Sequence, residues 1–152
     1  MIIGFTGTQS GMTSFQKKEL VKILLLKECS EFQHGDCIGA DEEANELATI
    51  ECGIKLITIH PPLHDVKRAY CFDPKKLMRQ ASSNWIQIGD LRVRWREPLP
   101  YLKRNNQIVD EVALMIACPK EDKHTVRSGT WQAIRHAWNI RRDIIIIPPL
   151  ER

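Results

Sequence analysis

Short apolar runs alternate with longer amphipathic stretches along this chain, and that alternation constrains the fold more than any other feature. The apolar runs have the length of strands, and the stretches between them repeat apolar residues at helical spacing. Strands joined one to the next by helices form a parallel sheet with helices on both faces. The sequence therefore predicts strands over residues 1–6, 31–34, 54–60, 112–118 and 144–148, with helices over 13–29, 41–52, 101–110 and 128–139.

Right-handed crossovers turn this alternation into a doubly wound, Rossmann-like α/β fold, in which helices flank a parallel sheet. The chain has 152 residues, of which 43% are hydrophobic and 27% charged, so it can bury a substantial core. We expect residues 1–152 to form a single domain. Residues 63–98 show neither periodicity for long, and an irregular insertion is predicted there.

The sequence indicates a cytoplasmic protein that does not contact a membrane. No apolar run approaches the length of a membrane span, and the first residues lead into a strand pattern rather than a signal peptide. The five cysteines are dispersed, without a C-x-x-C pair or a repeated Cys/His spacing. We therefore expect free thiols in a reducing compartment and no metal site, with Cys37 set apart because it lies in a candidate binding loop.

The first candidate loop follows the first predicted strand, where ligands of doubly wound folds bind. It consists of Gly7, Thr8, Gln9, Ser10 and Gly11. Glycines allow close approach of a ligand, and the following helix offers free amides to an anion, so the loop suits a phosphate. It lacks the lysine of a P-loop and does not match G-x-G-x-x-G. A plain structural turn is the alternative.

The second candidate loop repeats this design after the second predicted strand. It contains Gly35, Asp36, Gly39, Ala40 and Asp41. Asp41 stands at a helix start, where a carboxylate can cap the first amides, so capping is the alternative to ligand binding. Asp36 is harder to explain as a cap, and we expect it to accept hydrogen bonds from ribose hydroxyls.

Two further candidates lie at helix starts. Arg104 and Asn105 can engage a phosphate and a sugar or base edge, because arginine presents a rigid fork of donors. The start of the last predicted helix combines a cation with hydroxyls and amides, in the order Arg127, Ser128, Gly129 and Thr130. Each group alone could be ordinary surface or a capped helix, but four such loops at strand ends together favour a ligand site.

These motifs, in this order, resemble the SLOG superfamily of nucleotide-binding Rossmann-like domains, especially its small bacterial and phage members related to YpsA. The resemblance spans nearly the whole chain and implies a nucleotide crevice at the carboxyl ends of the strands. The superfamily also includes the LOG phosphoribohydrolases, the DNA-processing protein A family and molybdenum cofactor carriers. The motifs are Gly4-Phe5-Thr6-Gly7-Thr8, His34-Gly35-Asp36-x-x-Gly39-Ala40-Asp41, Tyr101-Leu102-x-Arg104-Asn105-x-x-Ile108-Val109-Asp110 and Ser128-Gly129-Thr130-Trp131.

The resemblance implies a protein that binds a nucleotide or a nucleotide-derived ligand, as a sensor, carrier or sequestering protein. No other cofactor is implied, and no catalytic residue is identified. The first alternative is a nucleotide N-glycosidase or phosphoribohydrolase of the LOG type, with Asp36 or Asp41 as the carboxylate. LOG enzymes carry a glutamate in P-G-G-x-G-T-x-x-E, and this chain has Ala133 at that position, which argues against the LOG mechanism.

The second alternative is single-stranded DNA binding. Residues 61–104 hold ten Lys or Arg against four Asp or Glu, so positive charge is concentrated there, and Trp85 and Trp95 could stack on bases. The net charge of the whole chain is a modest +3, and nucleic acid is therefore not the favoured partner. Because small parallel α/β domains often associate and Trp131 and Trp138 share one helix face, we expect a homo-oligomer, a dimer or larger.

Overall fold

The computed structural model describes residues 1–72, 84–123 and 128–150. The first half of the chain forms β1 (Ile2–Gly7), α1 (Ser14–Leu26), β2 (Glu31–His34), α2 (Ala40–Glu46) and β3 (Leu56–Ile59). A π-helical turn, η1 (Leu47–Glu51), extends α2, and a 3-10 turn, η2 (Asp65–Lys67), follows β3. The second half forms β4 (Trp85–Ile88), β5 (Leu91–Trp95), α4 (Tyr101–Glu111), β6 (Leu114–Cys118), α5 (Gly129–Asn139) and β7 (Asp143–Ile146).

These strands form one sheet in the order β4-β5-β3-β2-β1-β6-β7. Every neighbouring pair is parallel except β4 and β5, which are antiparallel. The chain builds outward from β1 through β2 and β3, and later returns to place β6 on the other side of β1. The order therefore reverses between β1 and β6, which is the topological switch point of a doubly wound fold. The predicted fold class is confirmed.

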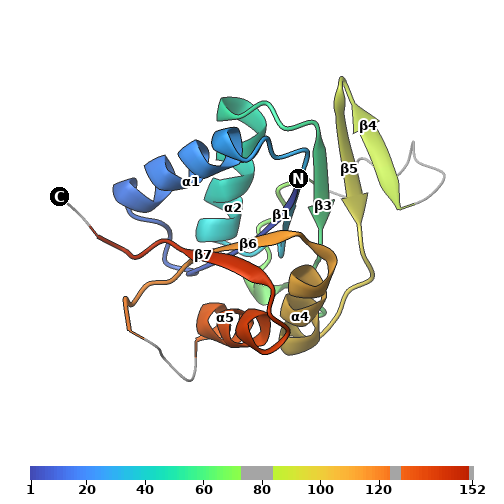
Figure 1. The fold of residues 1–152 in the computed structure, drawn as a ribbon. Helices are drawn as coiled ribbons and strands as arrows, with labels where there is room; N and C mark the ends of the chain where they lie inside the picture. The colour runs from blue at the N-terminus through green and yellow to red at the C-terminus, as the bar shows by residue number, and fades with distance from the viewer. Residues whose placement is uncertain (73–83, 124–127, 151–152) are drawn as a thin grey trace.

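Helices cover both faces of the sheet (Figure 1). α1 and α2 lie on one face, and α4 and α5 lie side by side on the other. Thr13 caps α1, since its side chain accepts a hydrogen bond from the Gln16 amide and its own amide donates to the Gln16 side chain. No helix in the described part of the chain is long and apolar enough to cross a bilayer.

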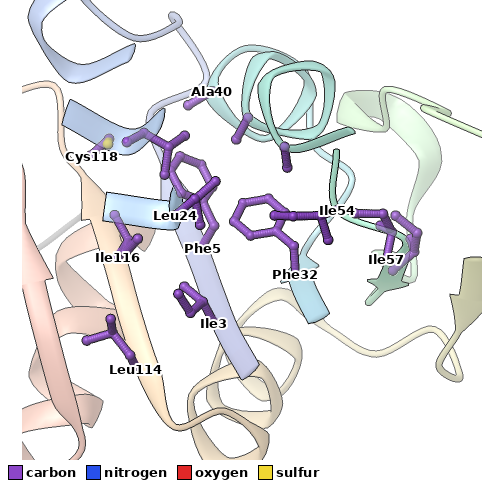
Figure 2. Packing of buried hydrophobic residues seen from close by; sticks show 14 of the residues in the cluster. Ile3, Phe5, Leu24, Phe32, Ala40, Ile54, Ile57, Leu114, Ile116 and Cys118 are labelled. Atoms are coloured by element: carbon purple, nitrogen blue, oxygen red, sulfur yellow. The ribbon is translucent and has the colours of Figure 1, made fainter. Parts of the chain in front are cut away.

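The larger core lies between the sheet and the helices α1 and α2 (Figure 2). Phe5 on β1 and Phe32 on β2 are fully buried, with ring centroids 5.9 Å apart. A second core packs α4 and α5 against β6, and it includes Val109, Met115 and Ala133. Ala133, the residue that the resemblance places at the position of the LOG glutamate, is therefore a core residue.

The segment predicted to be an irregular insertion contributes two strands. β4 and β5 form a hairpin around Gly89 and Asp90, and β5 pairs with β3 to extend the sheet. The expectation over 63–98 is therefore wrong for residues 85–95, while residues 73–83 lie outside the described residues. A Gly-Asp pair between two short alternating runs is a hairpin signal, and Gly89 has the positive φ of 60° that such turns require. Trp95 is buried in the core and cannot stack on a base.

Candidate functional site

A cleft of about 510 Å³ opens at the switch point, beyond the carboxyl ends of β1, β2 and β6. Its walls come from the loops after these strands and from the first turns of α4 and α5. This is the position that a doubly wound sheet predicts for a ligand. The lining residues are Phe5, Thr6, Gly7, Thr8, Gln9, Gly35, Cys37, Asp41, Lys67, Tyr101, Arg104, Asn105, Ile108, Lys120, Glu121, Ser128, Gly129, Thr130 and Trp131.

The cleft brings together most of the predicted binding residues from all four candidate loops. These are Gly7, Thr8, Gln9, Gly35, Asp41, Arg104, Asn105, Ser128, Gly129 and Thr130. Four predicted residues do not line it, namely Ser10, Asp36, Gly39 and Ala40. Arg127 lies outside the described residues.

Arg104 is a buried cation in the cleft wall, with 4% of its surface exposed. Its Nη1 donates to the carbonyl oxygen of Gly35 at 2.7 Å, and its Nε donates to Oδ1 of Asn105 at 2.9 Å. The acceptor found for Nη2 among the described residues is the weak one offered by Sγ of Cys37, at 3.6 Å. No carboxylate oxygen of a described residue lies within 4 Å of this guanidinium. Arg104 therefore forms no direct ion pair with a described residue, although its charge lowers the pKa of the nearby Asp41 carboxyl against the larger effect of burial.

Two neighbours fix the position of the Arg104 side chain. Gly35 allows the guanidinium to approach the loop after β2, because a Cβ at that position would overlap Nη1. Asn105 accepts from Arg104 and directs its Nδ2 toward the carbonyl oxygen of Gly129 at 3.5 Å. The cation on α4 is thus tied to the first turn of α5, and the two form one side of the cleft.

The first turn of α5 is the part of the cleft wall best suited to an anion, and we call it the anion seat. Ser128 caps the helix by accepting from the Trp131 amide at 3.3 Å, while the amides of Gly129 and Thr130 belong to the first turn, where no intrahelical acceptor exists. No acidic side chain lies in that turn. The start of α2 is different, because Asp41, Glu42 and Glu43 fill its first turn and repel an anion.

The first loop offers fewer amides to a phosphate than the sequence predicts. The Thr8 amide donates to the Cys118 carbonyl at 3.1 Å, and the Ser10 amide donates to the Thr8 hydroxyl at 3.2 Å. The Gly11 amide donates to the Thr8 carbonyl at 3.2 Å. This loop therefore shapes the cleft floor, and the amides available to a ligand are concentrated at α5.

The two aspartates of the second loop face different surroundings. Asp41 lines the cleft, and its Oδ2 accepts from the amides of Gly35 and Cys37, each at 3.2 Å. Burial raises the pKa of the Asp41 carboxyl. Asp36 is fully buried and instead accepts from Arg68 and from the Cys71 amide. Of the two carboxylates, only that of Asp41 can touch a ligand in this cleft.

Several cleft residues were not among the predicted binding residues. Tyr101 opens α4, and the Arg104 guanidinium carbon lies 5.0 Å from its ring centroid. Lys67 and Lys120 bring positive charge from the segments after β3 and β6, and Trp131 follows the anion seat on α5. Tyr101 and Trp131 belong to two of the sequence motifs given above, and these motifs could have predicted that both residues line the cleft. The two lysines carry no local signal, because their place depends on how distant loops fold.

Arg104 also contacts a buried polar network that is centred on His60. The carbonyl oxygen of His60, at the end of β3, accepts from Arg104 at 3.4 Å. The His60 imidazole is fully buried, with Nε2 2.7 Å from Oε1 of Gln33 and Nδ1 2.9 Å from Oε1 of Gln107. Burial lowers the pKa of His60 from 6.5 to about 4.

We expect His60 to make the protein less stable in mild acid. The unfolded chain binds a proton at this residue near pH 6.5 and the folded chain only near pH 4, so the contribution is complete above pH 6.5 and is lost as the pH falls toward 4. The loss amounts to about 3 kcal/mol of unfolding free energy. Urea unfolding at pH 7 and pH 4.5 measures it.

The variant His60→Gln is the comparison for this pH dependence. It should be less stable at pH 7 because the buried network is altered, but its stability should fall less steeply between pH 6.5 and pH 4. Equal slopes for the two proteins would show that other groups carry the acid sensitivity.

The chemistry of the described residues offers no metal site. No group of three His, Cys, Asp or Glu is arranged to hold an ion among residues 1–72, 84–123 and 128–150. The five cysteines are unpaired by disulfides, and Cys37 and Cys118 are buried. Burial raises the pKa of the Cys37 thiol, so this residue lacks the thiolate character of a nucleophile.

Comparisons with known proteins support the fold. No family model and no curated protein matches the sequence. Two solved structures are similar. The structural-genomics target TM1055 has a TM-score of 0.59 and 15% identity over 95% of this chain and 72% of its own. DNA processing protein A from Streptococcus pneumoniae has a TM-score of 0.61 and 22% identity over 95% of this chain, which spans about half (49%) of that protein. These likenesses show a Rossmann-like α/β fold.

Proposed function

We propose that the cleft binds a nucleotide or nucleotide-derived ligand through its phosphate, and that the protein acts as a sensor, carrier or sequestering protein. The observation that carries this proposal is Arg104, a buried guanidinium that has no carboxylate oxygen of a described residue within 4 Å. Burying a charge is costly unless a counter-charge compensates it. A phosphate in the cleft would supply that counter-charge.

The rest of the cleft is suited to the other parts of such a ligand. The amides of Gly129 and Thr130 and the hydroxyl groups beside them would hold phosphate oxygens at the positive end of α5. The Asp41 carboxylate, in the first turn of α2, lines the cleft and would accept hydrogen bonds from sugar hydroxyls. Tyr101 and Trp131 offer apolar surface to a base.

Native mass spectrometry of the purified protein, followed by identification of any released small molecule, tests the proposal. We expect a bound nucleotide, or, for protein that has lost its ligand, a thermal shift with ADP or another member of a nucleotide panel. The proposal would be overturned if the purified protein held no ligand and no nucleotide of the panel raised its melting temperature. The same spectrum measures the assembly, for which we expect a dimer or larger.

A second candidate function is cleavage of an N-glycosidic bond in the bound nucleotide. The observation in its favour is Asp41, a buried carboxylate in the cleft wall whose raised pKa suits proton transfer. Release of free base from AMP measures this activity. Asp41→Asn should abolish this activity, although the asparagine keeps an oxygen that can accept from the Gly35 and Cys37 amides. Glu42→Gln changes an exposed residue on the same helix and should leave the activity unchanged.

A further inference from the structure

A short segment crosses the loop after β2 and closes one side of the cleft. We call residues 65–71 the strap. The amide of Ile38 donates to the Lys67 carbonyl at 2.9 Å, and the amide of Ala69 donates to the Asp36 carbonyl at 2.7 Å. Cys37 and Arg68 form an antiparallel bridge between these bonds. The strap is therefore paired with the loop by main-chain hydrogen bonds.

Asp36 fastens the strap through both oxygens of its carboxylate. Oδ2 accepts from Nε of Arg68 at 3.0 Å, and Oδ1 accepts from the Cys71 amide at 2.9 Å. Asp36 is fully buried, and the Arg68 side chain is 11% exposed, so solvent screens this ion pair weakly. The Asp36 amide donates to Nδ1 of His34, which ties the loop back to the end of β2.

The backbone around this ion pair adopts a conformation that needs support. Asp36 has a φ of 55° and Tyr70 a φ of 54°, in the left-handed region that non-glycine residues rarely occupy. The Arg68 guanidinium carbon lies 4.5 Å from the Tyr70 ring centroid, and the Arg68 amide donates to the Asp65 carbonyl. Strained residues of this kind persist where surrounding contacts over-determine them, and they gather at ligand sites.

Of the strap residues, Lys67 lines the cleft. The carbonyl oxygen of Lys67 accepts one of the two main-chain bonds of the strap, and Lys67 directly precedes Arg68, so its position depends on the Asp36 ion pair. It stands on the β2 side of the cleft, whereas the anion seat of α5 lies on the β6 side. Lys67 and Arg104 would thus give the cleft positive charge beyond that seat.

We infer that Asp36 is a positioning residue of the ligand site, which holds the strap closed and thereby places the Lys67 ammonium group against an anionic part of the ligand. The inference rests on the proposed function and deepens it, because a cation in addition to Arg104 favours a ligand with more than one negative charge, such as a nucleoside diphosphate. Asp36 does not touch the ligand in this arrangement, since Arg68 and the Cys71 amide occupy its carboxylate.

Amide hydrogen exchange of the full chain without ligand tests the first half of the inference. In Asp36→Asn, the amides of Ala69 and Cys71 should exchange at least about tenfold faster than in the wild type. Asp90→Asn, which removes an exposed carboxylate paired with Lys55, is the matched control and should leave them unchanged. Unchanged exchange in Asp36→Asn would overturn the inference. Arg68→Gln breaks the same ion pair from the strap and serves if Asp36→Asn does not fold.

A double-mutant cycle with ADP as the probe tests the second half. Asp36→Asn and Lys67→Met should each weaken ADP binding by about 3- to 10-fold, and the double variant should bind no more weakly than the weaker single variant. Adenosine, which lacks phosphate, should bind all four proteins alike, and both single variants should show a smaller salt dependence with ADP. A merely structural role of Asp36 would weaken adenosine and ADP equally.

Two results separate failure of this inference from failure of the proposed function. The positioning role alone would be overturned if ADP binding depended on Arg104 but was unchanged in Asp36→Asn and Lys67→Met. It would also be overturned if the two substitutions had independent effects in the double variant. If the wild type binds no nucleotide of the panel, the proposed function fails and the positioning role fails with it, whatever the exchange rates.

Discussion

Replacement of Arg104 by methionine should weaken nucleotide binding by roughly 100-fold while leaving the protein folded. The guanidinium supplies the buried positive charge of the cleft, and a charge-assisted hydrogen bond to phosphate contributes about 3 kcal/mol. Methionine has a similar length and keeps the contact with the Tyr101 ring, but it carries no charge. Isothermal titration with the nucleotide found in the purified protein measures the effect.

The stability of this variant is as informative as its affinity. Arg104 forms no ion pair within 4 Å with a described residue, so its removal breaks hydrogen bonds but also relieves the cost of burying a charge, and the unfolding free energy should change by less than about 2 kcal/mol. Lys103→Met makes the same charge change at an exposed neighbouring position on α4 and should bind normally. Unaltered affinity in Arg104→Met would mean that Arg104 only clamps the loops, and the phosphate site would have to lie elsewhere.

Gly39→Ala should destabilise the protein by at least about 3 kcal/mol. Gly39 precedes α2 with a φ of 86°, and a Cβ there would overlap the carbonyl group of Gln9 in the loop after β1. The substitution combines backbone strain with a collision against rigid backbone, and both costs are large. For a chain of this size the melting temperature should fall by about 6–12 °C, which a thermal unfolding scan measures.

Gly53 provides the matched control for this substitution. It also has a positive φ, 65°, but no atom lies within 4 Å of the position that a Cβ would take. Gly53→Ala should therefore cost only about 1 kcal/mol, the strain of the backbone alone. If the two variants lost the same stability, the close contact between the β1 and β2 loops would have no energetic consequence.

The architecture was predictable from the sequence because each element carries its own local pattern. The run Leu114–Cys118 is wholly buried, as its unbroken apolar sequence indicates, and Thr13 caps α1 through a local motif. The hairpin of β4 and β5 carries a local signal as well, two alternating runs around a Gly-Asp turn, and the prediction of an irregular segment overlooked it. Arg94 is accommodated there by an ion pair at 2.9 Å with Glu31, a partner 63 residues away that no local pattern shows.

The candidate site was predictable by segment but not by side chain. Asp36 and Asp41 lie in one candidate segment and have the same chemistry, and the sequence favoured Asp36 as the residue that accepts from a ligand, whereas Asp41 is the one that lines the cleft. The structure distinguishes them through Arg68, which lies 32 residues beyond Asp36 and pairs with it. Lys67 enters the cleft through the same long-range pairing. Such assignments follow from tertiary packing, whereas the glycines and helix starts that shape the loops follow from local backbone geometry.

The side chain of Arg104 connects segments that are distant from one another in the sequence. Through Gly35, His60 and Asn105 it links the ends of β2 and β3 to α4, and Asn105 continues the link to α5. A partly folded chain therefore has no cleft, because the cleft exists only after the β1–β6 pairing has brought both halves together. A ligand that recognises this cleft would bind only the completely folded protein and would therefore stabilise it. The fraction of the protein that survives proteolysis would then rise with the ligand concentration in the cell.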